Sequence, residues 1–67
     1  MAVARVTEIT ASSSKSFEGA VNEGFTRACK TLRGITGLEV VRMTAHVENN
    51  AIKEYRVRMK VTFILED

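Results

Sequence analysis

The side chains of this sequence that could do chemistry are a row of bases, a few acids and one histidine. Arg56, Arg58 and Lys60 alternate along one stretch, so they share one side of an extended strand. Such a row could hold an anion or a nucleotide-like ligand, because these cations bind phosphate. The alternative is a solvated face neutralised by acids of neighbouring strands. Those acids are Glu8, Glu39 and Glu48.

Acidic side chains suggest a calcium site, because calcium takes about six to eight oxygen ligands. The candidates are Glu8 with Thr7 and Thr10, Glu48 beside Asn49 and Asn50, and the terminal pair Glu66 and Asp67. No EF-hand loop is present, so a site would have to gather oxygens from several subunits. Surface solvation is the alternative for each group. Glu8 is favoured because it lies within a predicted strand, whereas chain ends fray.

His46 and Cys29 are the only histidine and the only cysteine. Neither belongs to a pattern that pairs a nucleophile with a base, so the sequence predicts no enzyme. We interpret His46 as an ordinary surface residue and Cys29 as a small, half-buried helix residue. A single cysteine also excludes an internal disulfide.

The first half of the chain predicts a strand and a helix. Mostly β-branched and apolar residues favour a strand over 2–10. Apolar side chains at three- and four-residue steps predict a helix over 16–33. Ser13 or Ser14 is expected to cap its start, and Gly34 to end it in the left-handed conformation.

The second half predicts a hairpin. Alternating apolar and polar residues favour strands over 38–48 and 55–65. The pair Asn49–Asn50 is typical of a tight turn, because asparagine tolerates positive φ. Adjacent Val40 and Val41 break the alternation and suggest a bulge. The expected buried side of the first hairpin strand is Val41, Met43, Ala45 and Val47.

These elements predict an α+β fold, with a β-α-β-β order and one helix packed on a three-stranded antiparallel sheet. Residues 1–67 are read as a single domain. Gly24 lies on the apolar stripe of the helix, which indicates close approach of helix and sheet. Phe25 and Phe63 are expected in the core between them.

Size and charge limit the partners. A chain of 67 residues buries only about 60% of its unfolded surface, and no disulfide or zinc-type cluster supports it. Its open sheet edges therefore favour closed self-assembly. A net charge of +2 is too small to indicate nucleic acid. The absence of a signal peptide or a spanning segment predicts no membrane and a cytoplasmic location.

Several stretches together resemble the dodecin family. They are TEITASSSKSFEGAVNEG, RACKTLRGITGLEVVRMTAHV and AIKEYRVRMKVTFILED, which cover nearly the whole chain in order. The resemblance implies a hollow homododecamer of β-α-β-β subunits that sequesters a small ligand. Typical members store or buffer flavins, stacked in pairs across two-fold axes. Twelve copies would also multiply the field of any basic row.

Two positions depart from the flavin-binding pattern of that family. The tryptophan that sandwiches the flavin ring aligns with Gly37, and the glutamine at the ring edge aligns with Arg56. The sequence contains no tryptophan, so we expect flavin to bind poorly. The chain looks closer to the calcium-binding branch, and calcium is the predicted ligand. The alternatives are a flavin-storing dodecin and an assembly scaffold without a specific ligand.

Overall fold

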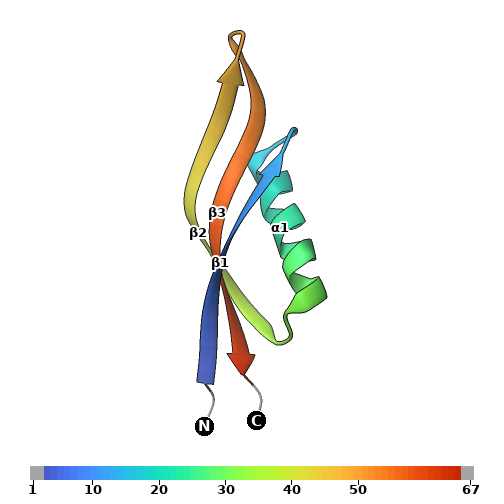
Figure 1. Cartoon of the computed structure of the whole chain (residues 1–67), viewed down its shortest axis with the longest axis vertical. Helices are drawn as coiled ribbons and strands as arrows, with labels where there is room; N and C mark the ends of the chain where they lie inside the picture. The colour runs from blue at the N-terminus through green and yellow to red at the C-terminus, as the bar shows by residue number, and fades with distance from the viewer. Residues whose placement is uncertain (1–2, 66–67) are drawn as a thin grey trace.

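Three strands and one helix make up the computed structural model, which describes residues 3–65. The order is β1 (Val3–Ser13), α1 (Phe17–Thr31), β2 (Ile35–Glu48) and β3 (Ala51–Leu65) (Figure 1). The strands form one antiparallel sheet in the order β1-β3-β2. The predicted β-α-β-β fold is therefore confirmed, with β3 at the centre of the sheet.

The long β2–β3 hairpin extends beyond the helix (Figure 1). Its tip is the predicted two-residue turn, where Asn49 and Asn50 have φ of 51° and 61°. The bulge is also confirmed, since the pairing with β3 shifts between Val40 and Arg42. Because the turn takes only two residues, β3 starts at Ala51, four residues before the predicted start.

The helix begins later than the serine run suggested. Its N-cap is Ser16, whose Oγ accepts a hydrogen bond from the Gly19 backbone N–H at 2.9 Å. The prediction of Ser13 or Ser14 as the cap is wrong. Ser13 instead ends β1 and accepts from the Lys15 N–H at 3.0 Å, which turns the chain toward the helix.

The connection from helix to β2 is tighter than predicted. The helix ends at Thr31, because Leu32 is already extended at φ −111° and ψ 143°. Gly34 has the predicted left-handed conformation, with φ of 70°. Its carbonyl accepts from the Ile64 N–H at 3.0 Å, so β2 pairs from Ile35 and not from the predicted start. Over the described residues, no helix is long and apolar enough to cross a membrane.

The core lies between α1 and the paired strands β1 and β3. Ala20, Val57 and Met59 are fully buried there. Gly24 allows the close approach that its place in the apolar stripe predicted. A Cβ at this position would lie 2.5 Å from the Met59 Cε and 3.0 Å from the Ala11 Cβ. Larger residues at this position would force the helix away from the sheet.

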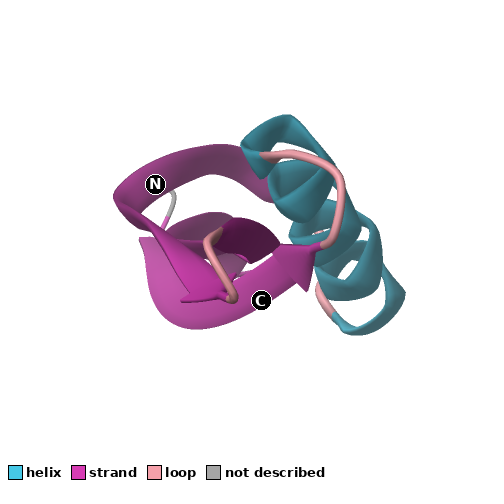
Figure 2. Cartoon of the chain, turned by 90° about the horizontal axis from the view of Figure 1, so that it is seen from above, coloured by secondary structure: helices cyan, strands magenta, loops and turns pink. Residues whose placement is uncertain are grey.

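The helix leaves β2 uncovered. Seen from above, it lies along one side of a strongly curled sheet (Figure 2). All four residues of the predicted buried side of β2 are exposed, and Met43 keeps 52% of its accessible surface. That prediction is wrong for the single chain, because one helix is too narrow to cover three curled strands.

Phe25 also lies outside the core, with 39% of its surface exposed, whereas Phe63 is half-buried. The chain is elongated, measuring 52 × 19 × 13 Å. Its radius of gyration is 13.9 Å, against about 11 Å for a compact chain of this length. Its surface of 5186 Å² exceeds the roughly 4200 Å² expected of a compact monomer. The fold of one chain leaves its apolar surface incompletely buried.

Candidate functional site

The candidate ligand residues lie on the side of the sheet that faces away from α1. Residues paired directly across antiparallel strands share a face. Glu8 pairs with Lys60, and Gly37 with Thr62, while Arg56 pairs on its two sides with Ser12 and Thr44. The buried residues Val57, Met59 and Val61 alternate with these and face the helix. We call the side away from the helix the polar face.

Gly37 leaves open space where the resemblance places a stacking tryptophan. A Cβ built at this position meets no other atom within 4 Å. Nothing in the described chain fills the space in its place. An aromatic side chain at this position would therefore have room.

Arg56 is engaged within its own strand. Its Nε donates to the Glu54 carboxylate, and both side chains are partly exposed. Arg56 and the Gly37 partner Thr62 are six residues apart on β3, which corresponds to about 20 Å. Gly37 and Arg56 of one chain therefore cannot contact the same ring. A ring that contacts both positions would have to take them from two different copies of the chain.

Thr7 and Glu8 point to opposite sides of β1. Thr7 pairs with buried Val61 and lines the helix side, whereas Glu8 is exposed on the polar face. Their side chains therefore cannot bind the same ion from one strand. From this strand, the Glu8 carboxylate and the Thr10 hydroxyl share the polar face and could supply oxygens together. Glu66 and Asp67, the other predicted ligands, lie outside the described residues.

The remaining acids of the described chain are spread out. Among residues 3–65, no three His, Cys, Asp or Glu side chains are grouped to hold a metal. Glu48 does not neutralise the basic row as predicted, because its carboxylate pairs with the His46 Nε2 at 3.0 Å. Glu8 and Glu39 do flank that row, since each is paired across the sheet with Lys60.

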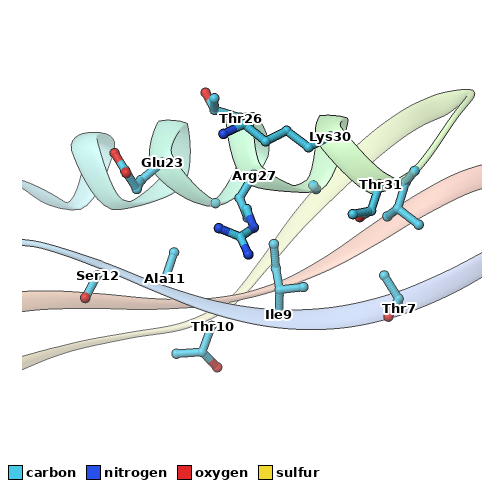
Figure 3. Close-up of a pocket in the computed structure, with 13 residues that line it drawn as sticks. Thr7, Ile9, Thr10, Ala11, Ser12, Glu23, Thr26, Arg27, Lys30 and Thr31 are labelled. Carbon is cyan, nitrogen blue, oxygen red and sulfur yellow. The ribbon is translucent and has the colours of Figure 1, made fainter.

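A groove of about 770 Å³ runs between α1 and the outer edge of β1. Ile9 and Ala11 point into it from the strand, and Arg27 reaches toward them from the helix (Figure 3). Sequence periodicity does not indicate this groove, because it does not tell which strand becomes an edge. Cys29 on the helix is exposed, which corrects its half-buried interpretation.

Fold and surface together define a small α+β subunit with unburied apolar surface and ligand-type residues on an open sheet face. The family model described as Dodecin matches residues 3–66. A curated dodecin from Thermus thermophilus is 33% identical over 60 residues, covering 90% of this chain and 87% of that protein. The chain therefore belongs to the dodecin family.

Solved structures of dodecins share the whole fold. An arginine-to-alanine variant of the Thermus thermophilus dodecin has a TM-score of 0.95 at 31% identity, with both chains fully covered. The dodecin from Streptomyces coelicolor gives 0.95 at 32%, covering 98% of this chain and 94% of its own. A calcium dodecin from Mycobacterium tuberculosis, described as calcium chelating, gives 0.84 at 26%, covering 96% and 91%.

Proposed function

We propose that this chain is the subunit of a homododecameric cage that sequesters a small ligand between its subunits. The observation that carries the proposal is the uncovered apolar side of β2. Val40, Met43 and Val47 are exposed there, whereas Val57, Met59 and Val61 of the neighbouring strand β3 are fully buried. Burying such surface contributes about 25 cal/mol per Å², so a second copy is its natural cover. The number twelve comes from the family.

We further propose that the ligand is calcium and that flavin binds poorly. Open space at Gly37 removes the aromatic wall of a flavin sandwich. Arg56 places a cation, already paired with Glu54, where the family has a neutral amide. The chain's contribution is binding, and we assign it no catalysis.

Glu8 is the residue we propose to bind the calcium ion. It is exposed on an ordered strand, with its carboxylate on the polar face. When symmetry copies bring several such carboxylates together they repel one another, and a divalent cation relieves that repulsion. The calcium-chelating dodecin among the structural relatives lends support to this ligand.

Native mass spectrometry of untreated protein tests the cage. Twelve copies of the 7.4 kDa chain predict an assembly of about 89 kDa, and any retained ion adds to its mass. A folded monomer at micromolar concentration would contradict the proposal.

Two titrations of the metal-free assembly test the ligand. Calcium should release or absorb heat in calorimetry, and riboflavin should show no sub-micromolar quenching. Glu8→Gln should abolish the calcium heat while the assembly mass stays unchanged. Glu18→Gln, which removes an exposed helix carboxylate, is the matched control. Unchanged calcium binding in Glu8→Gln would remove Glu8 from the site, and absence of calcium heat in the parent protein would favour a scaffold.

A further inference from the structure

The polar face is organised in rows that cross all three strands. One row is Glu8, Lys60 and Glu39, in which a base lies between two acids. Opposite charges paired across strands are stabilising, so Lys60 is compensated here, and the row keeps one acid in excess. The next rows toward the hairpin tip hold a different mixture of side chains. They are Thr10, Arg58 and Arg42, followed by Ser12, Arg56 and Thr44.

Arg42 and Arg58 form a like-charged pair within the first of these rows. They are direct cross-strand partners, which places their Cβ atoms about 5 Å apart. Like charges at such a spacing destabilise a sheet. In the described part of the chain, neither guanidinium has a carboxylate within salt-bridge distance, whereas Arg56 is held by Glu54. Among the described residues, two exposed cations therefore lie side by side without an ion pair to either.

Hydroxyl groups border this pair, one in the same row and one in the next row. Thr10 is the β1 partner of Arg58, and its side chain points away from the helix (Figure 3). Thr44 is the next residue after Arg42 on the same face of β2. Both hydroxyls are exposed and can donate hydrogen bonds. Two guanidinium forks with donors around them match an anion that has several oxygens.

We propose that Arg42 and Arg58, bordered by Thr10 and Thr44, form a binding site for a phosphate group. A guanidinium binds phosphate through two parallel N–H···O bonds, which adds geometric selectivity to charge attraction. The phosphate dianion offsets both positive charges and so relieves their repulsion. All four residues belong to one chain, so the site depends neither on the number of subunits nor on calcium binding at Glu8.

The competing explanation is that Glu39 neutralises Arg42 when the side chains move. Glu39 is the preceding residue of β2 on the polar face, separated from Arg42 by the bulge. In that case removing Glu39 would lower stability and phosphate would add little. With a phosphate site, Glu39→Gln removes a repelling carboxylate and should strengthen phosphate binding.

Thermal unfolding of the full-length protein in phosphate-free buffer is the test. Adding 10 mM inorganic phosphate should raise the melting temperature by several degrees over chloride at equal ionic strength, because a ligand of the native state stabilises it (on the order of RT ln(1 + [L]/Kd)). The same measurement is repeated with glycerol phosphate in place of inorganic phosphate. A larger shift with the ester assigns the site to phosphate monoesters, and a larger shift with inorganic phosphate assigns it to the free ion.

Arg42→Gln should have two opposite effects. Without phosphate its melting temperature should rise, because the like-charged pair is gone. Adding phosphate should then raise the melting temperature of the variant much less than that of the parent protein. Arg58→Lys keeps the charge but loses the fork, and should weaken phosphate binding about tenfold. Arg33→Gln, which removes an exposed arginine outside the polar face, should leave the phosphate response intact.

Native mass spectrometry of each variant shows whether the assembly is retained. Equal melting temperatures in phosphate and chloride, or a full phosphate response in Arg42→Gln, would overturn the site. Neither result bears on calcium binding, which is measured separately on Glu8→Gln.

Discussion

Strands β2 and β3 carry the same alternation of apolar and polar residues but end in opposite surroundings. In β3, Val57, Met59 and Val61 are fully buried under the helix. In β2, Met43 is the cross-strand partner of Val57 and faces the same side, yet it remains half exposed. The two strands form one hairpin, so local sequence does not explain the difference. The position of the helix does.

This contrast shows what an alternating pattern encodes. It specifies that one side of a strand is to be covered, but not by which part of which chain. The helix covers β1 and β3 because β1 is joined to it by only three residues, 14–16. In the proposed cage, another copy of the chain covers the apolar side of β2. Folding and assembly would then use the same kind of surface.

The most severe disruption should come from a charge on the bare side of β2. Met43→Asp would put an unpaired carboxylate into the proposed contact between copies, where burying it costs several kcal/mol. We expect the assembly to be lost in native mass spectrometry. Thr44→Asp adds the same charge one residue along, on the polar face beside Arg56. It should assemble normally. If Met43→Asp and Thr44→Asp assembled equally well, the two sides of β2 would not differ in their role in assembly.

A smaller effect is expected from truncation beneath the helix. Met59→Ala removes a fully buried side chain and should lower the free energy of unfolding by about 2–5 kcal/mol. Phe25→Ala removes a partly exposed one. From sequence it was expected to cost about 3–5 kcal/mol, as for a core phenylalanine. The exposure of Phe25 now predicts less than the Met59 loss. Urea unfolding measures both, and a larger loss for Phe25→Ala would show that another copy buries it.

The two glycines with opposite surroundings give a matched pair. Gly24→Ala gains helix propensity, but its methyl meets Met59 and Ala11 too closely, so we expect a net loss of about 1–2 kcal/mol. Gly37→Ala points into open space and should change stability by less than about 0.5 kcal/mol. Thermal unfolding measures both variants. A neutral Gly24→Ala would contradict the close contact between the helix and the sheet at this position.

Much of the fold could be read from the sequence because its signals are local. The 3.6-residue period gave the helix, the Asn49–Asn50 pair gave the turn, and adjacent Val40 and Val41 gave the bulge. The N-cap was misplaced because four serines lie within Ser12–Ser16, and only the backbone conformation selects Ser16. Which strand the helix would leave uncovered depends on sheet order and curl, which no local pattern contains.

The candidate site was less accessible to sequence reasoning. Alternation alone placed Arg56, Arg58 and Lys60 on one face. The register adds what each base faces, namely acids for Lys60 and a second arginine for Arg58. The register also separates Thr7 from Glu8, which the sequence grouped as one ligand cluster. Ligand residues contributed by different copies cannot be inferred from one chain's periodicity.

The smallest effect is expected at Gly37, where flavin-binding dodecins have the stacking tryptophan. Gly37→Trp restores an aromatic side chain on the polar face, and open space at this position allows it without displacing other atoms of the chain. Stacking on a ring contributes on the order of 0.5–1.5 kcal/mol beyond area burial, which corresponds to a gain of roughly two- to tenfold in affinity. Quenching of riboflavin fluorescence measures the gain.

The double variant Gly37→Trp/Arg56→Gln sharpens the same test. Gly37 and Arg56 are too far apart in one chain to contact the same ring, so any cooperation between them acts across subunits. We expect the two changes together to raise flavin affinity by more than the product of the single effects, and only in the assembled protein. Gly37→Phe, with a smaller ring, should gain less. Equal gains in dissociated and assembled protein would mean that the ring binds to one chain alone, and that bare β2 contributes to no shared ligand site.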